Sequence, residues 1–307
     1  MGIALCIVIG TLVWANLTVP ASKPLPTITT FARTTKVLQV VAAENFWGSL
    51  VSQLGGTHVH VVSIVSDPNA DPHEYETNTG NAREVADADY VIVNGAGYDS
   101  WAGKLLGAGT KPERGVLNVA DLLGKKEGDN PHFWYNPEYV NQTIAQMERD
   151  LVKLDPADEK YFTQQYQTVQ TSFAKQQARI TEVKRQFSGV NVASTEDVFV
   201  YLADATELKL MSPPAFIQAV GEGTDPPTAS VVAFEGLLKS RAVEVLIYNQ
   251  QTVTPLTETM KKLATDEGIP IVGVTETIQP PNETYQVWMD AQVKELQDAL
   301  RSISRRN

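Results

Sequence analysis

The run from Glu159 to Phe187 contains neither glycine nor proline, and no other feature of the chain constrains its fold so strongly. At about 1.5 Å per residue, an unbroken helix over this run is roughly 45 Å long. Such a helix is too long for a single crossover in a small sheet and matches the length of a whole domain. We therefore expect it, within a linking segment at 155–188, to join two separate lobes.

Short apolar stretches alternate with helical patterns on both sides of this run. Before it, "VHVVSIV" (59–65) and "YVIVNG" (90–95) are typical of strands, and after it so is "VEVLIYN" (243–249). Nearly continuous apolar strands followed by helices indicate parallel sheets covered by helices. The predicted fold class is α/β, with two lobes at 36–154 and 189–307. Each lobe is expected to be a mainly parallel sheet covered by helices, and one long rigid backbone helix joins them.

The N-terminal stretch "MGIALCIVIGTLVWANLTV" carries no charge and is just long enough to cross a bilayer. Two interpretations of residues 1–21 stay open: a secretory signal peptide with "VPA" at the cleavage site, or an N-terminal membrane anchor. Residues 22–35, rich in proline, threonine and serine, are expected to form a flexible tether. Either interpretation predicts an extracytoplasmic body, secreted or tethered to the cell membrane.

The only cysteine, Cys6, lies in the apolar N-terminal stretch, and "GIALC" lacks the small residues that precede a lipid-modified cysteine. The rest of the chain therefore has neither disulfides nor thiolate metal sites. The net charge of −11 argues against a nucleic-acid partner, which calls for a basic surface. Metalloprotease, nucleophile-elbow and phosphate-loop motifs are missing as well, and we do not expect an enzyme.

Four side chains of metal-ligating type follow predicted strands. His73 is in the loop after the strand at 59–65, His132 is in the loop after "VLNV", and Glu196 and Glu276 directly follow "VNVAS" and "IPIVGVT". Ligands bind beyond the carboxyl ends of strands in open α/β sheets, so two facing lobes bring these residues into one cleft. Two imidazoles and two carboxylates suit a divalent cation.

The residues beside Glu196 suggest how its charge is maintained. Ser194 or Thr195 is expected to cap the helix that Glu196 begins, and the positive end of that helix is expected to keep Glu196 ionised. Taken alone, a loop histidine is usually just solvated, and a glutamate at a helix start usually serves the helix end. The joint placement of the four residues is what favours a metal site.

Several other polar and aromatic residues are interpreted as structural. His58 and His60 alternate along a strand and are expected to lie on an exposed edge or to be paired in the sheet. Trp134 and Tyr135 are expected to pack under the His132 loop. Glu74 and Glu76 are expected to face solvent or to support the metal ligands from outside.

From Lys36 to its C-terminus the chain resembles the metal-binding component of ATP-binding-cassette importers for zinc or manganese, the cluster A-I solute-binding proteins. The resemblance rests on "DPHEYE", "ADADYVIVNGAGYDSWAGKLL", "NPHFWYNP", "STEDVFVYL" and "EGIPIVGVTET". It implies two α/β lobes joined by a long rigid helix, with a membrane permease and an ATPase as partners.

The resemblance also implies a ligand set. His73 and His132 match the two histidine ligands of the family, and Glu196 matches the third, which is often glutamate in manganese importers. Glu276 stands where the family usually has aspartate and is one methylene longer. The expected function is therefore capture of Zn²⁺ or Mn²⁺ between the lobes and delivery to the importer, by a protein expected to be monomeric.

Three alternatives remain open at this stage. A secreted metal-dependent hydrolase needs an open coordination position and a general base, for which Glu74 is the candidate. An adhesin-like surface protein on the same scaffold does not exclude metal transport. Zn²⁺ and Mn²⁺ are about equally well supported, because imidazoles favour zinc whereas carboxylates that bind through both oxygens suit manganese.

Overall fold

The computed structural model describes residues 36–69, 72–109 and 111–304. The segment from Lys36 onward forms one compact unit. The predicted signal or anchor at 1–21 and the predicted tether at 22–35 lie outside the described residues. No helix in the described ranges is both long and apolar enough to cross a membrane.

The N-terminal lobe is built on a four-stranded parallel sheet with the order β2-β1-β3-β4. Its strands are β1 (Leu38–Glu44), β2 (Val59–Val65), β3 (Tyr90–Val93) and β4 (Gly115–Asn118). Its helices are α1 (Asn45–Gly55), α2 (Thr79–Asp87), α3 (Ser100–Ala108), α4 (Val119–Leu122) and α5 (Pro137–Leu154), with 3₁₀ turns η1 (Gly56–His58), η2 (Pro72–Glu74) and η3 (Phe133–Tyr135). The strands "VHVVSIV" and "YVIVNG" were predicted correctly from their apolar runs.

The C-terminal lobe repeats this order with β6-β5-β7-β8, again in parallel. Its strands are β5 (Asn191–Ser194), β6 (Lys209–Leu210), β7 (Val245–Asn249) and β8 (Ile271–Val274). Its helices are α7 (Val200–Thr206), α8 (Pro214–Gly221), α9 (Thr228–Lys239), α10 (Pro255–Asp266) and α11 (Tyr285–Ser304), with the 3₁₀ turn η5 (Asp197–Phe199) before α7. The two-residue β6 and the helix α8 were missed by the sequence analysis.

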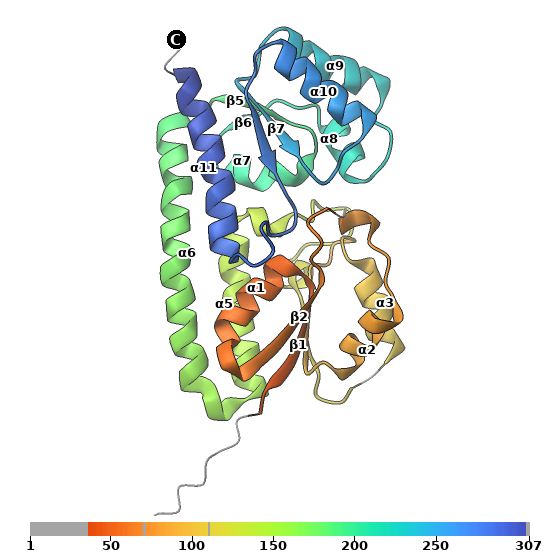
Figure 1. The fold of residues 1–307 in the computed structure, drawn as a ribbon, viewed down its shortest axis with the longest axis vertical. Coiled ribbons are helices and arrows are strands. Elements are labelled where there is room, and N and C mark those ends of the chain that lie inside the picture. Colours follow the sequence, from red (N-terminus) through yellow and green to blue (C-terminus); the bar gives the residue numbers. More distant parts are fainter. Residues whose placement is uncertain (1–35, 70–71, 110, 305–307) are drawn as a thin grey trace, which may run out of the picture. The chain divides into compact units, whose positions relative to one another are not determined.

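The long helix expected from the chain without glycine or proline is α6 (Glu159–Phe187), which follows the 3₁₀ turn η4 (Pro156–Asp158). It runs beside α11 (Figure 1) and packs against α1 and α5 of the first lobe and α7 of the second. Apolar side chains such as Phe162, Phe173 and Val183 are buried along its contact face. Burial of each contributes roughly 1.5–3 kcal/mol, which is why the helix stays joined to both lobes.

The lobes share one continuous hydrophobic core, which extends from Leu38 in β1 to Leu300 in α11. Hydrogen bonds cross between them at the segment after β8. The Tyr135 hydroxyl donates to the Thr275 carbonyl oxygen at 2.8 Å, and the Tyr285 hydroxyl donates to the Trp134 carbonyl oxygen at 2.6 Å. These contacts fix the backbone just before Glu276 against the lobe that carries the histidines.

Candidate metal centre

The four predicted ligands lie beyond the carboxyl ends of the two sheets. His73 is in η2, after β2, and His132 directly precedes η3. Glu196 follows β5 and Glu276 follows β8, each two residues beyond the last strand residue. Each lobe therefore presents two of the four side chains, as the strand-end argument predicts for open parallel sheets.

The structure brings three of the four close together. The Nε2 atoms of His73 and His132 each lie 3.3 Å from Glu276 Oε2. One ligand atom from each of these residues lies within 4.8 Å of the other two. His132 and Glu276 are fully buried, whereas the His73 side chain is 22% exposed. This spacing and burial fit a metal ion held out of bulk water with one accessible histidine.

Glu196 is not in that group of three, but a side-chain amide connects it to Glu276. Asn249 Nδ2 lies 2.5 Å from Glu196 Oε1 and 2.6 Å from Glu276 Oε1. Among the described residues, neither Glu196 Oε2 nor His132 Nε2 has a hydrogen bond, although both atoms are buried. Buried polar atoms normally have a hydrogen-bond partner, so these two atoms beside Glu276 are suited to bind a cation.

The other nitrogen of His132 fixes its tautomer. His132 Nδ1 is 2.9 Å from Asn130 Oδ1 and 3.4 Å from Asp197 Oδ1. Both partners are acceptors, so in the neutral imidazole Nδ1 carries the proton and Nε2 keeps its lone pair for a metal. Asn130 Nδ2 also donates to the Asp197 carbonyl oxygen at 2.7 Å, which ties the histidine loop to the other lobe.

The aromatic residues after His132 support its loop from below, as predicted. Trp134 and Tyr135 are buried, and the Trp134 ring stacks on Phe46 with centroids 4.0 Å apart. The same indole meets the His132 imidazole edge-on at 5.1 Å. These contacts hold the imidazole by packing, without adding a donor atom to the site.

The two buried carboxylates have opposite pKa shifts. Burial, and then the charge of Glu276, raises the pKa of Glu196 well above its usual value. Burial also acts to raise the pKa of Glu276, but interaction with the imidazoles of His73 and His132 holds it well below its usual value. Without a metal, Glu276 is therefore the charged member of the pair and Glu196 the more readily protonated one.

The prediction that a capped helix keeps Glu196 ionised is wrong. Glu196 itself precedes the short η5, and no side chain caps that turn. The Ser194 hydroxyl has no hydrogen bond within the described residues, and Thr195 Oγ1 instead accepts the Asn249 backbone N–H at 3.4 Å. Burial and the nearby charge of Glu276 raise the pKa of Glu196 in spite of its place at the start of η5.

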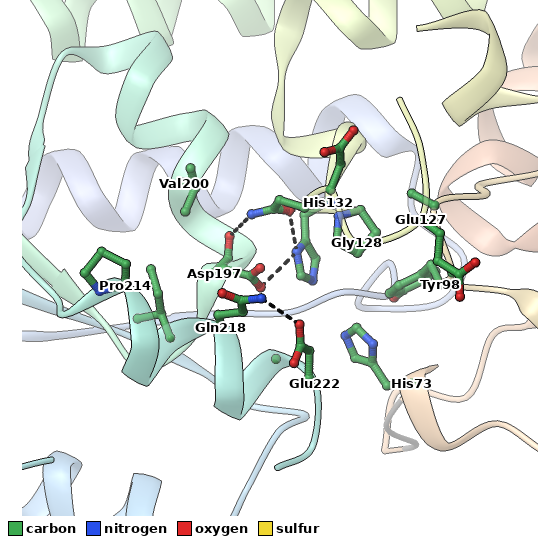
Figure 2. A pocket seen from close by; sticks show the side chains of 17 residues that line it. His73, Tyr98, Glu127, Gly128, His132, Asp197, Val200, Pro214, Gln218 and Glu222 are labelled. Atoms are coloured by element: carbon green, nitrogen blue, oxygen red, sulfur yellow. Dashed lines mark hydrogen bonds and ion pairs between the residues drawn. The ribbon is translucent and has the colours of Figure 1, made fainter. Parts of the chain in front are cut away.

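A cavity of about 640 Å³ opens from the two histidines. Figure 2 shows His73 and His132 pointing into the same space from different segments. The acidic residues on its lining are Glu127, Asp129, Asp197 and Glu222. Carboxylates around an opening attract cations, so the cavity is suited to admit a metal ion to the partly exposed His73.

Two supporting residues were missed in the sequence. Tyr98, just before α3, donates its hydroxyl to Glu276 Oε2 at 2.8 Å, and Asn249 ends β7. Neither residue type is a usual metal ligand. The only feature of the sequence that could have indicated Asn249 is its position, because it is a polar residue at the end of a strand that is almost entirely apolar.

The remaining histidines have structural surroundings. His58 Nδ1 lies 2.9 Å from Asp158 Oδ2, and its ring stacks on Tyr161 at 4.0 Å. His58, Asp155 and Asp158 also have ligand-type atoms within 4.8 Å of one another, but this histidine is already paired. His60 is exposed on β2, and Glu76, in the loop after η2, is exposed as well. The side chain of Glu74 lies outside the described part of the chain.

The chain is similar to several known proteins. The profile of the family described as zinc-uptake complex component A, periplasmic, matches residues 40–299. The chain is 23% identical over 255 residues to the manganese ABC transporter substrate-binding lipoprotein PsaA of Streptococcus anginosus, covering 76% of this chain and 78% of that relative. It is 26% identical over 180 residues to the manganese-binding lipoprotein MntA of Halalkalibacterium halodurans, covering 55% of this chain and 57% of that relative.

Among solved structures, the periplasmic zinc-binding protein TroA of Treponema pallidum has a similar fold. The TM-score is 0.74 at 17% identity, and the match covers 86% of this chain and 99% of TroA. At that identity the likeness establishes the two-lobed fold with its long connecting helix. The relatives include proteins named for manganese and for zinc, so their names do not decide between the two metals.

Proposed function

This chain belongs to the family of periplasmic zinc-uptake component A proteins, and from that membership and the geometry of its site we propose that it captures one divalent transition metal ion, Zn²⁺ or Mn²⁺, between its lobes. The family is the metal-binding, substrate-binding component of ATP-binding-cassette transporters and not an enzyme. In the proposed role the protein is a monomer outside the cytoplasm that passes the ion to a membrane permease driven by an ATPase.

One observation carries this proposal: ligand-type atoms of two histidines and a glutamate converge at the buried boundary between the lobes. Their mutual distances are within 4.8 Å, and Glu196 lies one amide away. A cation between them would satisfy the buried lone pair of His132 and the free oxygen of Glu196. No other group of at least three such side chains in the described residues is equally buried.

A binding role also explains the ligand count better than hydrolysis does. Two imidazoles and two carboxylates complete a four-coordinate shell, whereas a catalytic zinc keeps a position open for water. The proposed ligands are His73, His132, Glu196 and Glu276. The partly exposed His73 and the acidic cavity beside it give the ion a route in and out.

Thermal unfolding of the metal-stripped protein, with and without added Zn²⁺ or Mn²⁺, tests this function. A ligand present at about a thousand times its Kd stabilises the folded protein by about 4 kcal/mol, and Tm rises accordingly. The doubly substituted His73→Ala, His132→Ala variant is expected to lose this rise. His60→Ala, which changes an exposed histidine on β2, serves as the matched control and should keep it. If neither metal raises the Tm of the unmodified protein, the proposed function is wrong.

A further inference from the structure

Asn249 occupies an unusual position among the candidate ligands. It ends β7, the strand that lies between β5 and β8 in the sheet. Glu196 follows β5 and Glu276 follows β8, so the asparagine stands between the two carboxylates. Its side chain is fully buried, so every polar atom it carries needs a partner inside the protein.

The orientation of the Asn249 amide follows from hydrogen-bond chemistry. The Gln251 backbone N–H donates to Asn249 Oδ1 at 3.0 Å. Because a backbone N–H can only donate, the oxygen of the amide must face it and the nitrogen must face the carboxylates. The Gln251 side chain also accepts the Glu276 backbone N–H at 2.6 Å, so the loop after β7 holds both the amide and this ligand.

The two amide protons are directed at one oxygen of each carboxylate. Nδ2 contacts Glu196 Oε1 at 2.5 Å and Glu276 Oε1 at 2.6 Å, and Thr252 Oγ1 lies 3.0 Å from the same nitrogen. The second oxygen of Glu276 is the one that faces both histidine Nε2 atoms. The second oxygen of Glu196 has no hydrogen bond within the described residues.

Building on the proposed function, we propose that Asn249 is a positioning residue that makes the site prefer Zn²⁺ over Mn²⁺. By holding one oxygen of each glutamate, it leaves one oxygen of each to donate, and with the two histidines that makes four donor atoms. Four donors with two imidazoles suit tetrahedral zinc, whereas manganese prefers about six, mainly oxygen, donors. A glutamate released from Asn249 is able to turn both oxygens to the metal and raise the coordination number.

The test compares the Kd values for Zn²⁺ and Mn²⁺ of the unmodified protein with those of Asn249→Ala and Asn249→Ser. The alanine variant removes the donor, and the serine variant retains one hydroxyl donor and guards against a failure of the alanine variant to fold. Replacement of an outer partner of a metal ligand commonly changes affinity by roughly 10- to 100-fold. We expect the zinc-to-manganese preference to fall by at least about tenfold in the alanine variant and by less in the serine variant.

A spectroscopic readout separates positioning of the carboxylates from a general loss of structure. Co²⁺ bound in place of zinc absorbs strongly in the visible range when four-coordinate and weakly when six-coordinate. The unmodified protein is expected to show the intense bands and Asn249→Ala the weak ones. Asn191→Ala is the matched control: Asn191 begins β5, at the end of the strand opposite the site, and its amide donates to the Ala242 carbonyl oxygen at 3.0 Å. This control should retain both the preference and the bands.

Each outcome decides a separate claim. Metal binding with the same preference and the same cobalt bands in the Asn249 variants would overturn the role of Asn249 and leave the proposed function intact. A preference of the unmodified protein for Mn²⁺ over Zn²⁺ would also overturn the role of Asn249 and leave the proposed function intact. If the unmodified protein binds none of the three metals, the proposed function itself fails, and this inference fails with it.

Discussion

The two sheets have the same strand order, and their matching strand ends carry the same residue types. Glu44 ends β1, the first strand of its lobe, and Glu196 follows β5, the first strand of the other. Asn94 follows β3, and Asn249 ends β7, the third strands. All four side chains are at most 1% exposed. The two glutamates and the two asparagines therefore occupy equivalent positions in the two lobes, but their side chains have different partners.

The asparagines differ in what their amides hold. Asn94 accepts the Trp47 indole N–H at 3.1 Å and donates to the Pro131 carbonyl oxygen at 2.9 Å, just before His132. It positions a histidine ligand through the backbone. Asn249 donates directly to the carboxylates of its own lobe. Histidines need an acceptor on one ring nitrogen, whereas two neighbouring carboxylates need a donor between them.

The two glutamates both have a raised pKa, but they differ in the groups that surround them. Within the described residues, no donor reaches either oxygen of Glu44, whose side-chain partner is Asp99. Asp99 already accepts the backbone N–H groups of Asn94 and Gly95 at 2.6 and 2.8 Å. Burial, and then the charge of Asp99, raises the pKa of Glu44 well above its usual value. Glu44 is thus more readily protonated than an ordinary glutamate and lies beside Asp99, whereas Glu196 lies beside Asn249 and Glu276 and is a candidate ligand.

The largest expected difference between the lobes is in metal-dependent stability. Glu276→Gln removes a charged donor from the centre of the site and should abolish most of the stabilisation by Zn²⁺, which is about 4 kcal/mol at a thousandfold excess over Kd. Glu44→Gln removes a carboxyl group from the other lobe and should leave the stabilisation by Zn²⁺ unchanged. Thermal unfolding with and without zinc measures both. Equal losses would show that the two lobes do not differ in this way.

A second difference is expected in the pH dependence of the metal-free protein. Glu44 has a pKa near 4.5 when unfolded and a higher one when folded. As pH rises between these values the unfolded chain loses its proton first, so the protein loses stability by about 1.4 kcal/mol per pH unit. Glu44→Gln lacks this loss, and its stability relative to the unmodified protein should grow from about pH 4.5 upward. Urea unfolding across pH 4–8 tests this, and a pH-independent difference would contradict it.

The smallest expected effect concerns the hydroxyl that joins the lobes. Tyr98 in the first lobe donates to Glu276 Oε2 in the second at 2.8 Å. Tyr98→Phe should cost the empty protein about 1 kcal/mol and weaken metal binding about tenfold, because this hydrogen bond orients a ligand oxygen. Tyr75→Phe, which removes a hydroxyl contact with Asn81 within one lobe, is the control. Titration calorimetry and urea unfolding measure the two effects, and equal metal affinities in both variants would rule out the orienting role.

Much of the architecture could be predicted from local patterns. The helix α6 follows from a run without glycine or proline, and β3 and β7 follow from short apolar runs between turn signals. β6 could not be predicted, because two residues, Lys209–Leu210, are too few to show a periodicity. The location of the site could also be predicted from local patterns, because the carboxyl ends of strands in a parallel sheet lie at one edge. His73, His132 and Glu276 do converge there, and the metal they would hold awaits measurement.

The two-lobed α/β fold, the long helix and the strand ends at which ligand-type side chains gather can be predicted from the chain alone, because they depend on periodicity and turn signals within short segments. Three features depend on the tertiary structure alone: which oxygen of Glu196 and of Glu276 Asn249 contacts, which nitrogen of the neutral His132 ring carries the proton, and the raised pKa of Glu44. Asn249 lies 53 residues from Glu196 and 27 from Glu276 along the chain. Charge and hydrogen bonding at a buried site depend on distances between such remote groups and on the exclusion of water, and neither leaves a local pattern in the sequence.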